Sequence, residues 1–198
     1  LQPIVTGLGE VLPVSVHPGD EVAHDELAET LVNLGYAATD LVEKRGQFAI
    51  RGGILDVFPP TEEHPLRVEF WGDDVEEIRY FRVSDQRSLE SARHGLWAPP
   101  CRELLLTPAV RERAAALALQ HPELAEMCTK LAEGIAVEGM EALAPVLADG
   151  LESVVDVLAR SQVGNAAPLV LLCDPELVAT RAHDLVAERQ VAIKLQLD

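Results

Sequence analysis

Four acidic residues close together in the sequence are the first candidates for chemistry: Asp73, Asp74, Glu76 and Glu77. Neighbouring carboxylates can bind a metal ion or transfer protons. These four, however, lie in and just after a segment typical of a hairpin turn, beginning at Gly72, where aspartate is a common residue. We therefore interpret them as a solvated turn and predict neither a catalytic nor a metal-binding site there.

Other patterns that indicate catalysis are also missing from the sequence. The six histidines are never at a ligand spacing such as His-x-x-x-His, and His24, His64 and His121 are expected at the surface near loops or helix ends. A phosphate-binding loop needs a glycine-rich turn that ends in Lys and Ser or Thr. Neither Gly7–Gly9 nor Arg51–Gly53 has this form. The sequence therefore predicts no catalytic residue, no metal ligand and no cofactor in this chain.

The segment Leu66–Trp71 is more informative, because apolar and polar side chains alternate along it as in a half-buried strand. The expected core face carries Leu66, Val68 and Phe70, and the opposite face carries Arg67, Glu69 and Trp71. Tryptophan and arginine are enriched in the energetically dominant positions of protein interfaces. Two interpretations remain open: a binding surface, or a surface Trp covered by arginine stems.

The segment Gln47–Arg51 alternates in the same way. Phe48 and Ile50 are expected to face the core, which leaves Arg51 facing outward. The glycine pair Gly52–Gly53 follows, and it indicates a bulge or a close approach of two backbones before the strand continues from Ile54.

These segments belong to a predicted small α+β domain that ends near residue 95. A helix with Leu27, Leu31 and Leu34 on one stripe precedes a region, from Thr39 to about Val83, whose period of two predicts an antiparallel sheet. Short strands and tight turns after one helix are typical of such a domain.

Beyond Pro99–Pro100 the pattern becomes helical. Thr107 with Pro108 predicts a helix start, and His121 with Pro122 predicts another, ended by Gly134. Two further helical stretches are expected within residues 138–158, interrupted near Pro145 and by Gly150. Leu169–Cys173 reads as a buried strand, Asp174–Pro175 as the start of a helix to about Arg189, and Val191–Leu197 as another strand. This β-α-β order predicts part of a parallel sheet whose other strands lie outside the chain.

Composition narrows the range of partners. The formal net charge of −17 opposes autonomous binding to DNA, because affinity for nucleic acid depends on Lys and Arg. No apolar run is long enough to cross a bilayer, so no membrane association is expected. The three cysteines, Cys101, Cys128 and Cys173, are widely spaced, and we expect buried thiols in a reducing, cytoplasmic setting. Because the chain opens mid-pattern without Met, we expect a piece of a longer protein.

Two motifs, Arg45–Pro59 and Arg67–Arg79, resemble the domain that UvrB and the transcription-repair coupling factors (Mfd) share. The segments Ser84–Glu90 and Leu131–Glu141 resemble the coupling-factor version, of an actinobacterial kind. The resemblance covers almost the whole chain. It implies that the chain comes from the N-terminal, UvrB-homologous part of a coupling factor.

The resemblance implies a fold class that combines α/β and α+β parts. Residues 14–98 would form a small antiparallel-sheet domain with a helix, like domain 2 of UvrB, that binds UvrA. Residues 1–13 would be the tail of the first half, and residues 99–198 the second half, of a larger, degenerate helicase-like α/β domain.

The resemblance also implies partners and a site. Arg51, Arg67 and Trp71 would bind UvrA, with Trp71 at a position that is commonly Phe in the family. We expect a charge reversal at either arginine to abolish binding without disturbing the fold. The parent protein would engage stalled RNA polymerase and DNA through other domains and use ATP and Mg in separate motor domains. Its C-terminal domain would mask the UvrA surface. The alternatives are a fragment of a UvrB-like damage-recognition helicase and a scaffold without a docking role.

Overall fold

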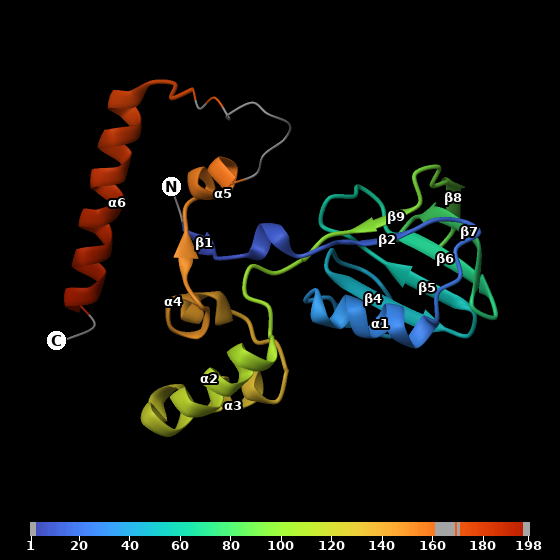
Figure 1. Cartoon of the computed structure of the whole chain (residues 1–198), viewed down its shortest axis with the longest axis horizontal. Helices are drawn as coiled ribbons and strands as arrows, with labels where there is room; N and C mark the ends of the chain where they lie inside the picture. The colour runs from blue at the N-terminus through green and yellow to red at the C-terminus, as the bar shows by residue number, and fades with distance from the viewer. Residues whose placement is uncertain (1–2, 161–168, 170, 196–198) are drawn as a thin grey trace. The chain divides into compact units, whose positions relative to one another are not determined.

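The computed structural model describes residues 3–160, 169 and 171–195, with side chains to residue 186 (Figure 1). The chain divides into two compact units, one made of Val5–Leu151 and the other of the terminal segments, including the residues from Glu152 onward. Each unit is described by itself.

A six-stranded sheet dominates the first unit, with the strand order β3-β4-β5-β6-β7-β8. The strands are β3 (Ala37–Ala38), β4 (Gln47–Arg51), β5 (Ile54–Val57), β6 (Leu66–Trp71), β7 (Asp74–Phe81) and β8 (Ser88–Ser91). Neighbours run antiparallel except for β3 and β4, which are parallel. The antiparallel sheet predicted over residues 39–83 is thus confirmed.

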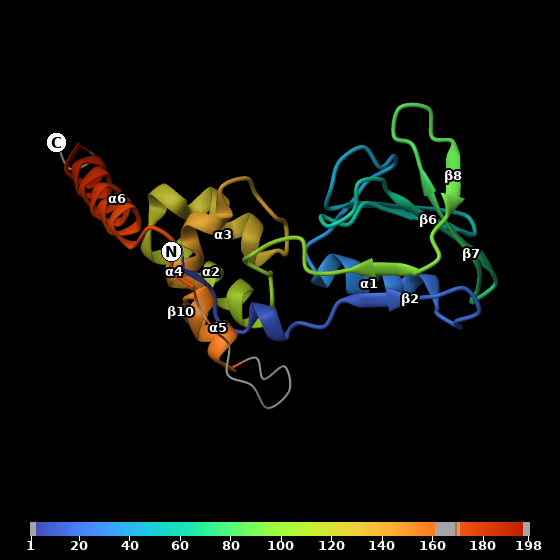
Figure 2. The ribbon, with the colours of Figure 1, turned by 90° about the horizontal axis from the view of Figure 1, so that it is seen from above.

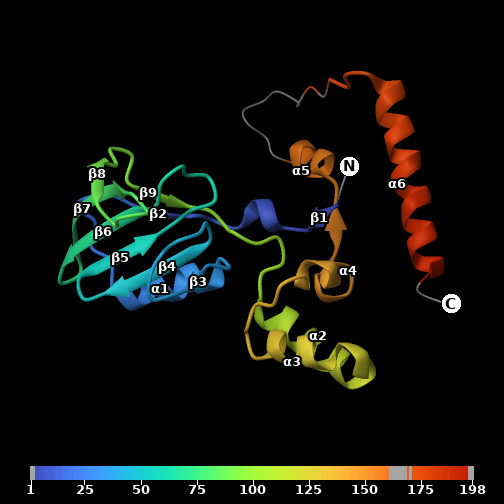
Figure 3. The same ribbon diagram turned by 180° about the vertical axis from the view of Figure 1, so that it is seen from behind.

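Helix α1 (His24–Asn33) lies along one face of this sheet (Figures 1 and 3). Its predicted stripe is confirmed, because Leu27, Leu31 and Leu34 are all buried. They belong to one hydrophobic core with the inward-facing residues of the sheet, among them Phe48, Leu55, Val57, Leu66, Val68, Phe70, Val75 and Ile78. The short antiparallel pair β2 (Val14–Val16) and β9 (Leu96–Ala98) adds to the same core, and Figure 2 shows the two strands side by side.

The prediction that Ile50 is buried is wrong. Ile50 is 39% exposed although its partner Leu55 is fully buried, because β3 pairs with β4 only as far as Phe48 and leaves Ile50 on the edge of the sheet. Ala49, on the opposite face, is buried instead. It belongs to a second apolar cluster with Val42, Phe58 and Phe81. The outward face of the sheet is therefore partly covered.

The glycine pair forms a hairpin turn, since Arg51 pairs with Ile54 across it. The chain therefore reverses direction there. Gly52 has φ +58°, a conformation that favours glycine. A Cβ on Gly53 would lie 2.9 Å from the carbonyl oxygen of Phe70, which confirms the predicted close backbone approach.

The rest of this unit is mainly helical. It contains η1 (Leu8–Glu10), α2 (Pro108–Gln120), η2 (Pro122–Leu124), α3 (Ala125–Ala132), η3 (Met140–Leu143) and α4 (Ala144–Leu147). The two short strands β1 (Ile4–Val5) and β10 (Leu151–Glu152) cross the boundary between the units. The predicted cap is confirmed, because the Thr107 side chain accepts a hydrogen bond from the Val110 amide. Gly134, with φ +86°, follows α3 as expected. Pro145 lies in the first turn of α4 and does not interrupt a helix.

The β-α-β prediction for the C-terminal segment is wrong in the residues that the structure describes. Leu169, Leu171 and Leu172 are exposed and form no strand, while residue 170 lies outside the described residues. Helix α6 runs from Pro175 to Leu195, through most of the second predicted strand, and residues 196–198 lie outside the description. Helix α5 (Val154–Arg160) is the other helix of this unit in the described residues. A strand needs neighbours for its backbone groups, and the two-residue strands β1 and β10, which enter this unit at Ile4 and Glu152, pair with each other in a sheet of two strands.

The three cysteines differ in burial, although all three were predicted to be buried. Cys128 is buried, Cys101 is partly buried and Cys173 is exposed, so the expectation of a buried thiol is wrong for Cys173. Among the described helices, none is both long and apolar enough to span a bilayer.

Candidate functional site

The outward face of the sheet brings together side chains from three strands. Residues directly opposite each other in an antiparallel pair lie on the same face. The register therefore places Asp56 of β5 between Ala49 of β4 and Arg67 of β6. The next row along the strands contains Arg51, Ile54, Glu69 and Glu77.

Asp56 is the centre of this arrangement, because its fully buried carboxylate binds both arginines. Arg67 donates from Nε to Oδ1 at 2.7 Å and from Nη2 to Oδ2 at 2.8 Å. Arg51 donates from Nη2 to Oδ2 at 2.5 Å. A buried charge is tolerated when it is paired and hydrogen-bonded, and both oxygens of Asp56 meet that condition. We call Arg51, Asp56 and Arg67 the arginine–aspartate cluster.

Arg67 is held on several sides, and its side chain is only 14% exposed. Its guanidinium lies over the Phe81 ring, 4.7 Å from the centroid, and Nη1 donates to the carbonyl oxygen of Gln86 at 3.3 Å. The hydrogen bonds with Asp56 raise the pKa of Arg67 above its ordinary value, against the opposing effect of burial. Arg67 therefore stabilises the fold as well as contributing to the surface.

Arg51 has a different environment. Its side chain is 46% exposed and is joined to Asp56 through a single nitrogen. Within the cluster itself two guanidinium groups meet one carboxylate, an excess of one positive charge, while Glu69 of the same face also acts on Arg67. Because Arg51 is the more exposed of the two arginines, that charge is most accessible to a partner at Arg51.

Trp71 is 76% exposed at the end of β6. The residue before it is well anchored: Phe70 is buried, its ring centroid lies 3.9 Å from that of His24, and its amide donates to the Gly53 carbonyl at 2.8 Å. His24 is thus partly buried, which corrects the prediction that it lies at the surface. The hydrogen bond to Gly53 joins the β4–β5 turn, next to Arg51, to the end of β6 that carries Trp71.

Trp71 is not covered by an arginine stem in the part of the chain that the structure describes. The cation–π contacts found there join Arg67 to Phe81 and Arg45 to Phe58. The indole of Trp71 is therefore presented to solvent, which does not fit the interpretation of a surface Trp covered by arginine stems.

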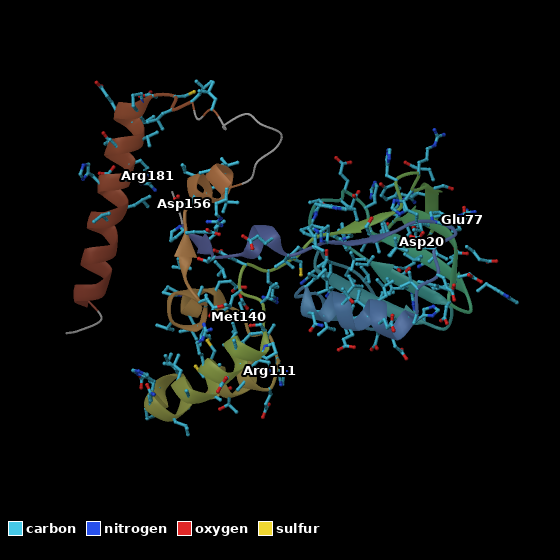
Figure 4. The ribbon with its side chains drawn as sticks, viewed as in Figure 1. Asp20, Glu77, Arg111, Met140, Asp156 and Arg181 are labelled. Atoms are coloured by element: carbon cyan, nitrogen blue, oxygen red, sulfur yellow. The ribbon has the colours of Figure 1, made fainter. Side chains whose placement is uncertain are left out.

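The acidic hairpin is a solvated turn, as predicted, since Asp73, Asp74 and Glu76 are all exposed. Glu77, labelled in Figure 4, pairs with Arg79 at 2.6 Å and accepts a hydrogen bond from Ser91. These contacts, with that to Arg79 the strongest, lower the pKa of Glu77. In the described residues, no group of three or more His, Cys, Asp or Glu could hold a metal ion.

The structure thus brings Arg51 and Arg67 together and places Trp71 at the same end of the sheet as Arg51. The residue that the sequence analysis missed is Asp56. A signal was present, because Asp56 is a lone acid in the otherwise apolar strand Ile54–Val57, and a charge in a buried strand requires a partner. Chemically, this surface offers guanidinium donors and an aromatic ring, a combination suited to recognising a protein surface.

A comparison with protein families gives the class of domain to which this sheet belongs. Residues 14–99 match the family model described as the UvrB interaction domain. These residues therefore belong to that domain family. UvrABC system protein B of Streptococcus agalactiae is 37% identical to this chain over 82 residues, which are 41% of this chain and 12% of that protein.

Longer matches identify the particular relatives. The transcription-repair-coupling factor of Mycobacterium tuberculosis is 50% identical over 196 residues, 94% of this chain and 15% of the relative. The factor of Myxococcus xanthus is 38% identical over 186 residues, 89% of this chain and 15% of that protein. The chain is thus homologous to transcription-repair-coupling factors over nearly its whole length, and it spans about 15% of theirs.

Proposed function

We propose that this chain is the UvrA-recruiting part of a transcription-repair coupling factor and that it docks UvrA through Arg51, Arg67 and Trp71. The observation that carries the proposal is the co-facial arrangement of a charged, partly exposed Arg51 and a 76% exposed Trp71 within a UvrB interaction domain. The chain resembles both transcription-repair-coupling factors and UvrABC system protein B, which supports a partner common to the two kinds of protein.

The physical basis of docking would be burial of the indole together with the pairing of the excess charge. A tryptophan gains much on desolvation, and arginine forms directed hydrogen bonds with carboxylates. Both groups are anchored on strands, so little conformational freedom is lost on binding. This surface needs no bound nucleotide or metal for such recognition, and the module would act without catalysis.

The remaining roles of the parent protein would belong to other parts of it. RNA polymerase, DNA, ATP and Mg would be bound outside this chain, in transcription-coupled nucleotide excision repair. Residues 14–98 would be the docking domain. Residues 1–13 and 99–198 would belong to the helicase-like domain, whose further strands would come from elsewhere in the parent. The net charge of −17 supports the assignment of DNA binding to other domains.

Calorimetric titration of the chain with UvrA from the same organism tests this proposal. We expect saturable binding of UvrA and no heat of binding with ATP or with duplex DNA. Absence of UvrA binding would contradict the proposal and favour a scaffold role. Binding of ATP, or binding of DNA that falls steeply with salt, would instead favour a fragment of a UvrB-like helicase.

A further inference from the structure

We infer that Asp56 is a positioning residue of this docking surface, which fixes the guanidinium groups of Arg51 and Arg67 relative to each other. The inference rests on the proposed function and adds a residue to it. Asp56 has 0% exposure, so it acts on a partner only through the two arginines.

The hydrogen-bond pattern supports this role. Both oxygens of Asp56 are used, and Oδ2 is shared between Arg51, at 2.5 Å, and Arg67, at 2.8 Å. Charge-assisted bonds of this length are among the stronger ones in proteins. One carboxylate thus joins β4 to β6 from its place on the strand between them.

Without the carboxylate, the two guanidinium groups would lose their common anchor. They would repel each other, and the one that is 46% exposed, Arg51, would be able to rotate into solvent. An exposed arginine that must be ordered on binding loses rotamer freedom, which weakens affinity. Asp56 removes that loss in advance by ordering Arg51 in the free chain.

The influence of Asp56 extends to a neighbouring loop through Arg67. The third contact of Arg67 is the carbonyl oxygen of Gln86, at 3.3 Å. Gln86 has φ +59°, a backbone conformation that a non-glycine residue adopts only when its surroundings hold it there. The contact from Arg67 helps to hold this conformation. Asp56 therefore orders two parts of the surface: the side chain of Arg51 directly, and the loop at Gln86 through Arg67.

A double-mutant cycle on UvrA affinity distinguishes a positioning role of Asp56 from a merely structural role. The variants are Asp56→Asn, Arg51→Ala and their combination, with Asp25→Asn as a control because Asp25 is an exposed aspartate of α1, on the core side of the sheet. If Asp56 positions Arg51, we expect Asp56→Asn to weaken UvrA binding about tenfold alone and about threefold or less when Arg51 is already Ala. Equal losses in both backgrounds would overturn the inference, as would an unchanged affinity.

A measurement on the unaltered chain keeps the inference testable if Asp56→Asn does not fold. Nuclear magnetic resonance of the free chain should show guanidinium protons of Arg51 and Arg67 that exchange slowly with water, and fast exchange at the exposed Arg93. Exchange at Arg51 as fast as at Arg93 would overturn the positioning role. This measurement requires no UvrA. Failure of the wild-type chain to bind UvrA would contradict the proposed function, while the proton exchange still decides whether Asp56 orders the arginines.

Discussion

Asp56 and Arg67 form a two-pronged ion pair across neighbouring strands, with Nε to Oδ1 at 2.7 Å and Nη2 to Oδ2 at 2.8 Å. The carboxylate is fully buried and the arginine side chain is 14% exposed. Arg51 joins the same carboxylate but stays 46% exposed. The two arginines that the sequence suggested as equivalent therefore have unequal roles in the fold.

The first prediction concerns the stability of Arg67→Glu. This change places a second carboxylate against the buried Asp56, and breaking a buried ion pair typically costs about 3–5 kcal/mol. We expect a loss of that order in the free energy of unfolding, measured by urea denaturation, and a much smaller loss for Arg51→Glu. The earlier expectation that charge reversal at Arg67 leaves the fold intact is therefore revised. Equal stability of Arg67→Glu and the wild type would show that the pair is not formed in solution.

The second prediction concerns the charge at Arg51. Arg51→Glu replaces the accessible positive group of the cluster with a negative one, so we expect UvrA affinity to fall by at least about 30-fold, as for a hot-spot residue. Arg93→Glu makes the same charge change at an exposed position of the same domain and should alter affinity little. Titration of both variants gives the comparison. Similar losses in the two variants would indicate a nonspecific effect of charge.

The third prediction concerns the close approach at Gly53. In Gly53→Ala the new Cβ would lie 2.9 Å from the Phe70 carbonyl oxygen, so the strand that carries Trp71 must shift. Overpacking of this kind costs about 1–3 kcal/mol, and we expect weaker UvrA binding as well. Gly52→Ala is the control, because it meets no atom within 4 Å and is disfavoured only by its φ of +58°. It should lower stability without affecting UvrA affinity beyond a small change. Wild-type stability of Gly53→Ala would contradict the register.

The fourth prediction concerns alkaline pH. Burial raises the pKa of the Cys101 thiol to about 11 from its ordinary 9, against the effect of Arg102. The unfolded chain loses this proton first, so the contribution of Cys101 to stability is complete below pH 9. It falls as pH rises from about 9 to about 11. Burial also raises the pKa of Tyr36, whose hydroxyl donates to the Pro99 carbonyl, and this adds to the loss.

Comparison with Cys101→Ser isolates the thiol in that experiment, because serine does not titrate in this range. The wild-type chain should lose stability more steeply than Cys101→Ser between pH 9 and 11, measured by thermal unfolding. Parallel curves for the two proteins would show that Cys101 is not buried as described.

Strand alternation alone was enough to predict the two faces of Leu66–Trp71 and the exposure of Trp71, because period two is a local property of a strand. The local pattern predicted the burial of Ile50 and of His24 wrongly. Ile50 is exposed because β3 covers the edge of β4 only as far as Phe48, and His24 is partly buried because it packs against Phe70. Both outcomes depend on contacts between segments distant from the local pattern.

The cluster around Asp56 shows the same limit. Asp56 stands out as a lone acid in an apolar strand, but only the register of β4, β5 and β6 shows that Arg51 and Arg67 both reach it. The prediction of a buried strand at Leu169–Cys173 failed for a different reason. Its composition is typical of a strand, but a strand also needs a neighbour, and the sheet formed by β1 and β10 does not include these residues.

The central claim, that the face with Trp71 docks UvrA, is tested most directly by titrating UvrA with Trp71→Ala and with Trp97→Ala. Trp97 is the matched control, because it is 45% exposed but lies on β9, outside the six-stranded sheet. We expect Trp71→Ala to lower affinity by at least about 30-fold and Trp97→Ala to change it by less than about threefold. Wild-type affinity in Trp71→Ala would contradict the account.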